Sequence, residues 1–216
     1  MSAETFNQRQ MDDGDLTIAH VTTMVRHWQE MNRLRVDGMA GPLTRASIEE
    51  YGRYWPLRAL SDGRFPDITS GFKARNASRP RHNGVDIFYP YLPGDPPMPV
   101  GDGGRTRKWW IPDGTVAVAV CNAYVHVAAP GATGHRVWLR AEGDDYFGYF
   151  HLSGLLVEQG GVVKAGDPIG VVGDNPVDND ARHLHFEVHR GLLKNYPDGL
   201  LDPEDEMVEW AVLPPT

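Results

Sequence analysis

His183-Leu184-His185-Phe186-Glu187-Val188 is the stretch from which the fold and the chemistry of this chain can be worked out. Polar and apolar residues alternate along it, which is the pattern of a β-strand with one covered face. Successive side chains of a strand point to opposite faces. We therefore expect His183, His185 and Glu187 on one face, with the three apolar side chains packed against a core.

Two imidazoles on one strand can bind a metal or transfer protons, but a catalytic zinc usually takes three protein ligands. Candidate partners lie upstream in Arg81-His82-Asn83-Gly84-Val85-Asp86-Ile87. On a straight strand, His82 and Asp86 would be ~13 Å apart at ~3.3 Å per residue, too far for ligands of one metal. We therefore predict a bend at Asn83-Gly84, where glycine permits unusual backbone angles.

A further histidine, His151, ends the strand-like run Tyr149-Phe150-His151-Leu152. His-x-x-x-Asp, a histidine before leucine, and His-Leu-His-Phe-Glu together resemble the motifs of the lysostaphin/LytM-type zinc metallopeptidases, which are peptidoglycan endopeptidases. Ile68–Phe72, Val162–Gly170 and Asp202-Pro203 are similar to the opening, the hairpin before the second motif and the end of that fold. The motifs occur in the family's order, which makes their combination far more specific than any one alone.

This resemblance implies a mainly β protein, with an antiparallel β-sheet catalytic domain and one zinc ion. By the same resemblance, His82, Asp86 and His185 are the zinc ligands. His151 and His183 are the catalytic pair that does not ligate the metal, and the sequence does not say which of them is the base and which stabilises the oxyanion. We interpret Glu187 as an ordinary strand-surface glutamate rather than a group that orients an imidazole.

The remaining histidines and the single cysteine receive structural interpretations. His20 and His27 are expected to be exposed on a helix, and His126 and His135 to be structural. His189 is expected at the surface, at the end of its strand. Cys121 follows an apolar run and is interpreted as a buried thiol; with one cysteine, no internal disulfide is possible.

The chain divides into four predicted parts. They are a disordered lead (1–15), a small helical module (16–55), a linker (56–67) and the metallopeptidase domain (68–216). Apolar residues recur at three- and four-residue steps after Leu16 and predict a first helix, and a second is expected from Leu43 to Tyr51.

Part of the helical module has a signature of its own. Trp28-Gln29 and the segment 34–45, which contains Val-Asp-Gly and Gly-Pro, resemble a small peptidoglycan-binding module. The alternative is a helical hairpin that packs on the catalytic domain and binds nothing. Phe88–Pro112 departs from the metallopeptidase pattern as a long insertion rich in proline and glycine. It forms either one wall of the substrate groove or a packed surface insertion.

Composition narrows the functional classes. The net charge is −8 and no basic patch is present, which argues against a nucleic-acid partner. No run of 18 apolar residues predicts a membrane span. The first residues lack the features of a signal peptide. The resemblance implies action on the wall outside the cytoplasm, in the periplasm or extracellularly. We therefore expect either export by another route, as for a phage lysin or an injected effector, or a sequence that has been shortened.

These observations lead to one functional hypothesis and two alternatives. The hypothesis is a monomeric, zinc-dependent endopeptidase that uses metal-activated water to hydrolyse peptide bonds of bacterial peptidoglycan, in the stem peptide or the cross-bridge. The first alternative is a non-catalytic peptidoglycan-binding or regulatory protein on the same fold. The second is a zinc peptidase that acts on glycine-rich proteins.

Overall fold

The computed structural model describes residues 11–12, 17–31, 35–40, 53–72, 82–96, 109–173, 182–208 and 210–215. It contains two compact units, Met1–Gly52 and Arg53–Thr216, which are described separately. The predicted helix from Leu43 to Tyr51 and most of the lead lie outside the described residues. No helix in the described ranges is both long and apolar enough to span a membrane.

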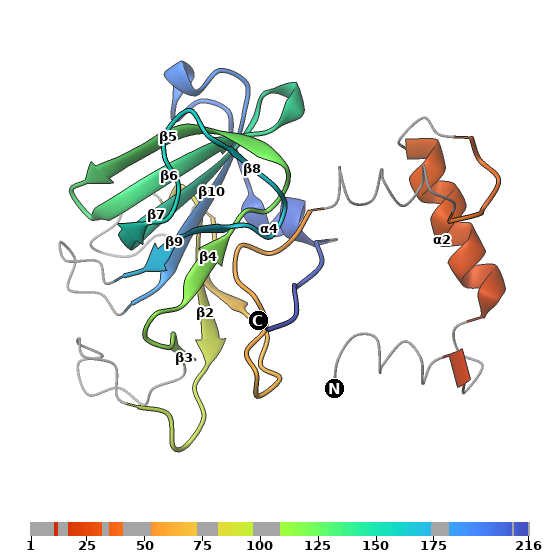
Figure 1. Cartoon of the computed structure of the whole chain (residues 1–216), viewed down its shortest axis with the longest axis horizontal. Coiled ribbons are helices and arrows are strands. Elements are labelled where there is room, and N and C mark those ends of the chain that lie inside the picture. Colours follow the sequence, from red (N-terminus) through yellow and green to blue (C-terminus); the bar gives the residue numbers. More distant parts are fainter. Residues whose placement is uncertain are drawn as a thin grey trace. The chain divides into compact units, whose positions relative to one another are not determined.

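The first unit contains the predicted helix, α2 (Ile18–Met31), drawn in red in Figure 1. Near its end, the buried amide of Gln29 holds the segment 35–40. Its Nε2 donates to Asp37 Oδ1 and to the Met39 carbonyl, and its Oε1 accepts from the backbone N–H groups of Asp37 and Gly38. The signature residues Gln29 and Asp37 therefore have a structural role within the unit.

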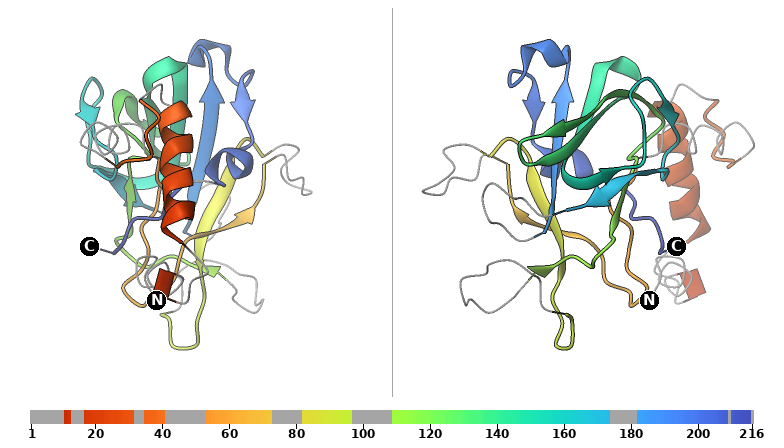
Figure 2. Two further views of the ribbon diagram at one scale, coloured as in Figure 1. Left: turned by 90° about the vertical axis from the view of Figure 1, so that its right-hand side faces the viewer. Right: turned by 60° about the vertical axis from the view of Figure 1, so that its left-hand side comes forward.

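The second unit is built on an antiparallel sheet with the strand order β1-β2-β10-β7-β6-β5-β8 (Figures 1 and 2). The strands are β1 (Asp67–Ser70), β2 (Val85–Pro90), β3 (Trp109–Trp110), β4 (Val116–Val118), β5 (Ala123–Gly131), β6 (Gly134–Arg140), β7 (Asp145–Leu155), β8 (Val162–Val163), β9 (Pro168–Val172), β10 (Leu184–Arg190) and β11 (Leu200–Leu201). The short helices are η1 (Glu142–Asp144), η2 (Leu193–Asn195) and α4 (Pro203–Met207). The fold is thus mainly antiparallel β, as predicted.

The core lies on the face of β10 that carries its apolar residues. Leu184, Phe186 and Val188 are fully buried, as the alternation predicted. Phe186 packs edge-on against Tyr149 of β7, with ring centroids 5.3 Å apart. Leu57, which belongs to the predicted linker 56–67, is also fully buried in this core. Burying such side chains stabilises the fold by about 1.5–3 kcal/mol each.

The opposite face of β10 is covered as well, and two predictions about it were wrong. Glu187 is 3% exposed and His189 is fully buried, so neither is a surface residue. His189 donates from Nε2 to the carbonyl of Asp198, and the ring of Tyr196 stacks on it at 6.4 Å. The chain that follows β10 therefore returns over the polar face, a long-range effect that alternation along one strand does not reveal.

The two ends of the Phe88–Pro112 insertion pair with each other. β3 lies antiparallel to β2, with Tyr89 opposite Trp110. The guanidinium of Arg64 lies 4.8 Å from the ring centroid of Trp110 and forms an ion pair with Asp95 at 2.6 Å. The described ends are thus packed on the domain, while residues 97–108 lie outside the described residues.

A charged cluster fixes the start of β7. Asp145 receives hydrogen bonds of 2.9 Å from Arg53 and from Arg190. Burial raises the pKa of this carboxyl, but Arg190 and Arg53 outweigh burial and leave the pKa below its usual value. A group with a lowered folded pKa stabilises the fold above its unfolded pKa of about 3.9, and this stabilisation is lost as the pH falls through the folded value.

We therefore expect Asp145→Asn to lower the free energy of unfolding at pH 7 by about 1–3 kcal/mol, the range for charged hydrogen bonds to partly exposed partners. The difference from wild type should begin to shrink below about pH 3.9, where Asp145 of the unfolded chain becomes protonated, and should vanish once the pH lies below the lowered folded pKa. Urea unfolding across this pH range measures both effects. Glu158→Gln, at an exposed position, is the matched control. A difference that does not shrink as the pH falls below about 3.9 would contradict this assignment.

Candidate metal centre

Neighbouring strands bring two of the predicted ligands together. Asp86 of β2 lies directly opposite His185 of β10 in the antiparallel register. The chain bends at Gly84, as predicted, which returns His82 to the same point. A Cβ at Gly84 would lie 2.2 Å from the carbonyl oxygen of Phe186, so only glycine permits this close approach to β10.

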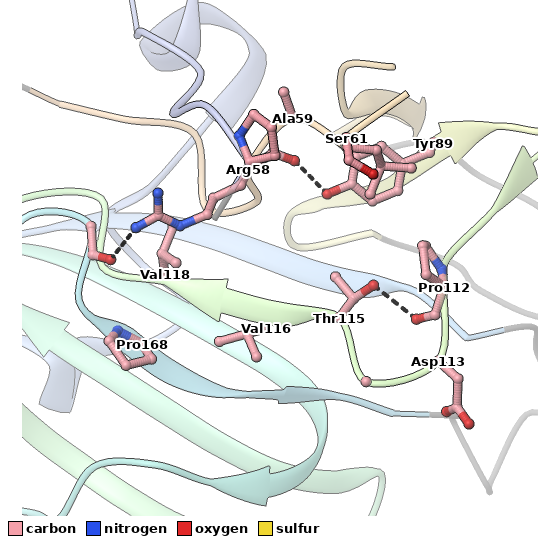
Figure 3. Close-up of a pocket in the computed structure, with 14 residues that line it drawn as sticks. Arg58, Ala59, Ser61, Tyr89, Pro112, Asp113, Thr115, Val116, Val118 and Pro168 are labelled. Carbon is pink, nitrogen blue, oxygen red and sulfur yellow. Dashed lines mark hydrogen bonds between the residues drawn. The ribbon is translucent and has the colours of Figure 1, made fainter. Parts of the chain in front are cut away.

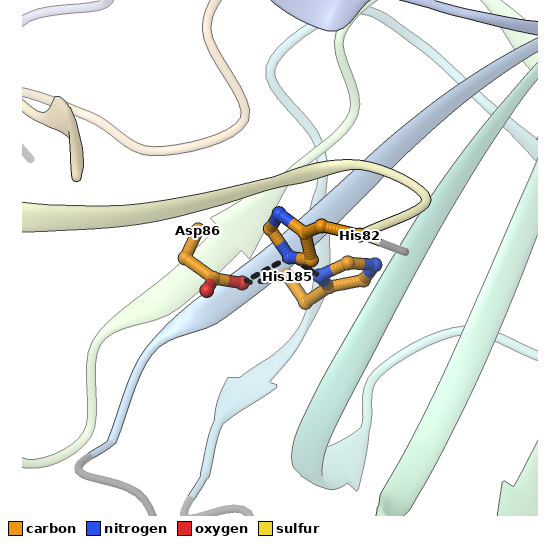
Figure 4. A group of neighbouring side chains, drawn as sticks. All are labelled: His82, Asp86 and His185. Atoms are coloured by element: carbon orange, nitrogen blue, oxygen red, sulfur yellow. Dashed lines mark hydrogen bonds and ion pairs between the residues drawn. The ribbon is translucent and has the colours of Figure 1, made fainter. Parts of the chain in front are cut away.

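The side chains of His82, Asp86 and His185 converge in Figure 4. The Oδ1 atom of Asp86 lies 3.1 Å from His82 Nε2 and 3.0 Å from His185 Nδ1. These two ring nitrogens are 3.0 Å apart. A tetrahedral zinc with ligand bonds of ~2.0–2.1 Å separates its ligand atoms by ~3.3 Å, so the group is close to the size that zinc requires.

In each imidazole, the ring nitrogen that faces away from the cluster (the outer nitrogen) determines the protonation of the nitrogen that faces it (the inner nitrogen). His82 Nδ1 lies 2.9 Å from the carbonyl oxygen of Gly71, which can only accept a hydrogen bond. His185 Nε2 lies 3.0 Å from Oε1 of Glu187. Each outer nitrogen therefore carries a hydrogen in the neutral ring, and each inner nitrogen presents a lone pair. Two lone pairs and a carboxylate oxygen within 3.1 Å of one another form a donor set that fits a metal ion.

The pKa values of these groups reflect the same cluster. Burial raises the pKa of Asp86, but hydrogen bonds with His183, His185 and His82 outweigh it and keep this carboxyl ionised. Burial lowers the pKa of His185, but hydrogen bonds to Asp86 and Glu187 outweigh it and raise this pKa to about 9. Without a metal, His185 is protonated at neutral pH, and its positive charge offsets the negative charge of Asp86.

Zinc must displace that proton to bind, and this predicts a pH dependence. Below about pH 9 the metal-free centre retains the proton on His185, so apparent zinc affinity should rise with pH and level off above this value. Near pH 7.5, about one proton should be released per zinc bound. Calorimetric titrations in buffers of different ionisation enthalpy count this proton. No proton release at pH 7.5 would contradict the prediction.

The two other predicted histidines lie beside this group. The ring centroid of His151 is 4.7 Å from that of His183 and 5.8 Å from that of His185. His183 Nε2 lies 3.4 Å from Oδ1 of Asp86, and its ring stacks on Phe88. The structure therefore brings together all five residues selected from the sequence.

His151 is held in one orientation by its surroundings. Its Nδ1 lies 2.9 Å from the carbonyl oxygen of Thr133, so Nδ1 carries the hydrogen and Nε2 is a proton acceptor. Burial, and then the neighbouring His183, lower the pKa of His151 to about 4. His151 is therefore neutral at pH 7.

The backbone at His151 adopts a left-handed conformation, with φ of 60°. This conformation is uncommon for residues other than glycine, and such strain is frequent at functional sites. Gly134 makes room for it, since a Cβ there would lie 3.3 Å from the Cα of His151. The Gly173 N–H donates to the carbonyl of His151 at 2.7 Å and secures the turn of the chain.

A cavity of about 470 Å³ lies elsewhere in the domain (Figure 3). Its two charged side chains are already engaged. Arg58 donates to the carbonyls of Gly166 and Pro214, and Asp113 accepts from Arg182. None of the five site residues lines this cavity. Both charged side chains of this cavity are therefore committed to contacts within the described part of the domain.

For Glu187, the sequence favoured a surface position over a role in orienting an imidazole, and the favoured position was wrong. Glu187 is buried and hydrogen-bonded to His185. A glutamate at the surface of the strand would make no such contact. The spacing His185-x-Glu187 already placed both side chains on one face of a strand. The sequence thus contained a signal for this contact in the residue spacing. It contained no signal for the later segment of the chain that covers Glu187.

Comparisons with known proteins agree with this geometry. Residues 107–197 match the model of peptidase family M23. The match includes His151, His183 and His185, whereas His82 and Asp86 precede it. No curated protein sequence matches the chain.

Solved structures show the same fold. The domain resembles the antimicrobial peptidase lysostaphin from Staphylococcus simulans with 21% identity and a TM-score of 0.51, over 71% of this chain and 55% of that one. A solution structure of lysostaphin gives 21% identity and a TM-score of 0.50, over 74% and 60% of the two chains. A zinc-containing peptidase from Vibrio cholerae gives 23% identity and 0.47, over 69% and 39%.

These matches cover less than two thirds of the three compared chains, and the two lysostaphin structures establish a common fold. The family model and the ordered motifs add the sequence relationship. Residues 107–197 are therefore similar to peptidase family M23, and the β unit shares its fold with lysostaphin.

Proposed function

We propose that this protein is a zinc-dependent endopeptidase that hydrolyses peptide bonds in bacterial peptidoglycan. The observation that supports it most is the cluster of three acceptor atoms within 3.1 Å of one another, flanked by two further imidazoles. The match of residues 107–197 to peptidase family M23 agrees with this chemistry. His82, Asp86 and His185 hold one zinc ion in the proposal.

When bound at such a site, zinc lowers the pKa of a water ligand to about 7 and polarises the carbonyl of the scissile bond. His151 then accepts a proton from the attacking water at Nε2, because its Nδ1 is committed to the Thr133 carbonyl. The same nitrogen delivers the proton to the leaving amine. His151 is neutral at pH 7, so the lone pair of Nε2 is available to accept the proton.

His183 stabilises the developing oxyanion. The carboxylate of Asp86, 3.4 Å from His183 Nε2, favours a hydrogen on that nitrogen. When Asp86 ligates the metal, this N–H would be available to the oxyanion that develops beside the metal position. Stacking on Phe88, with 5.4 Å between centroids and 19° between the ring planes, fixes the orientation of the imidazole. The two histidines therefore take different roles, as acceptor and donor.

We assign the substrate from the family rather than from a groove. The lysostaphin match and the likeness of residues 28–45 to a peptidoglycan-binding module both favour cell-wall peptidoglycan, which lies outside the cytoplasm. In this proposal the protein acts as a monomer, and the α2 unit carries it to the wall.

Digestion of purified peptidoglycan by the full chain, read by mass spectrometry, tests the function. New peptide amino termini should appear, should vanish with a zinc chelator, and should identify the stem-peptide or cross-bridge bond. Glycine-rich protein substrates, digested in parallel, distinguish a protein peptidase. Intact peptidoglycan that nonetheless co-sediments with the protein would replace the proposal with a non-catalytic binding function.

A further inference from the structure

A buried carboxylate contacts the outer side of one metal ligand. Glu187 follows His185 by two residues on β10 and lies on the same face. It is 3% exposed, and its Oε1 lies 3.0 Å from Nε2 of His185. A carboxylate can only accept this hydrogen bond, so the contact fixes the hydrogen on Nε2 and leaves Nδ1 to face Asp86.

The same oxygen has a second donor. The hydroxyl of Tyr196 lies 3.3 Å from Oε1 of Glu187. Nδ2 of Asn83 donates to that hydroxyl at 2.7 Å. The hydrogen of Tyr196 is thereby directed to Glu187. These hydrogen bonds link Asn83, through Tyr196 and Glu187, to His185. Asn83 directly follows His82, so the two histidines of the centre are connected by this network.

The ring of Tyr196 is positioned separately from its hydroxyl. It stacks on His189 with an interplanar angle of 24° and meets Trp138 edge-on at 6.2 Å. Tyr196→Phe therefore removes the hydrogen bond to Glu187 and preserves the ring contacts. This separation makes the role of the hydroxyl measurable.

We infer that Glu187 is a positioning residue for the metal ligand His185, and that Tyr196 holds Glu187 in place. The inference rests on the proposed zinc function for the identity of the metal. Glu187 fixes the ring orientation of His185 before the metal arrives, and it keeps the hydrogen on Nε2 once Nδ1 binds the metal. Loss of a hydrogen-bonding partner behind a metal-bound histidine typically weakens metal binding by about 10–100-fold.

Zinc affinity of the full chain, measured by competition with a chromophoric chelator, tests the inference without any substrate. Glu187→Ala should bind zinc about 10–100-fold more weakly than wild type. Glu187→Gln keeps an acceptor oxygen for both hydrogen bonds and should restore most of this loss. Tyr196→Phe should weaken binding by about 3–10-fold, a smaller share of the same effect. Glu158→Gln and Tyr124→Phe, at exposed positions, are the matched controls.

A spectroscopic signature separates positioning from general stability. In the zinc-loaded protein, the Nε2–H proton of His185 should give a downfield, slowly exchanging NMR signal. The signal should disappear in Glu187→Ala and persist in Glu187→Gln. Thermal unfolding of each metal-free variant shows whether it folds.

Three results would overturn the inference. The first is a folded Glu187→Ala variant that binds zinc within twofold of wild type. The second is an equal loss of zinc affinity in Glu187→Gln and Glu187→Ala. The third is a Tyr196→Phe variant with the same zinc affinity as Tyr124→Phe. The last comparison remains decisive if Glu187→Ala does not fold. A wild-type protein that binds zinc but cleaves no peptidoglycan would refute the proposed function and leave this test intact.

Discussion

Replacing His185 with alanine is expected to abolish both zinc binding and hydrolysis, whereas His183→Ala should keep the metal and lose turnover. In the proposed site, His185 Nδ1 is one of three ligand atoms within 3.1 Å of one another, so its removal would leave a centre with two ligands. We expect zinc affinity to fall by more than about 100-fold, beyond the range seen for outer hydrogen-bonding partners. His183→Ala should lower kcat by about 10²–10³, the range for loss of an oxyanion donor.

Metal content after dialysis, together with initial rates on peptidoglycan, separates these two variants. His20→Ala, at an exposed position on α2, is the control for removal of an imidazole and should match wild type in both measurements. Equal zinc loss in His183→Ala and His185→Ala would contradict the division into ligand and donor.

The second large effect is expected at His151. His151→Asn removes the proton acceptor while retaining a residue type that tolerates the left-handed backbone, so the fold and the zinc site should remain. We expect kcat to fall by about 10²–10⁴ with little change in zinc affinity. His151→Val should in addition destabilise the domain by about 1–3 kcal/mol, because a β-branched residue is strained at φ of 60°.

Initial rates, zinc affinity and thermal unfolding of the two variants check this prediction. A kcat for His151→Asn within threefold of wild type would exclude His151 as the proton acceptor. Equal melting temperatures for the Asn and Val variants would contradict the backbone argument.

Local sequence patterns were sufficient to predict the strand and the bend that position the site. Alternation along 183–188 predicted the strand β10 and its apolar face, and the His82-to-Asp86 spacing required the bend found at Gly84. Both are short-range consequences of strand geometry, which is why the sequence reveals them.

Features that depend on contacts between separate segments of the chain could not be predicted from the sequence. Glu187 and His189 were assigned to the surface because nothing in their neighbourhood shows that Tyr196 returns over them. The roles of His151 and His183 stayed open because the Thr133 carbonyl that fixes the ring of His151 belongs to another part of the chain. Such contacts arise only when the sheet has assembled.

The measurement that tests the central claim most directly is a zinc titration of the metal-free full chain on purified peptidoglycan. New peptide amino termini are counted by mass spectrometry at each step. The account predicts no cleavage without metal and a rate that rises to a plateau at one equivalent of zinc. Cleavage that is unaffected by removal of the metal, or no cleavage at any zinc concentration, would contradict it.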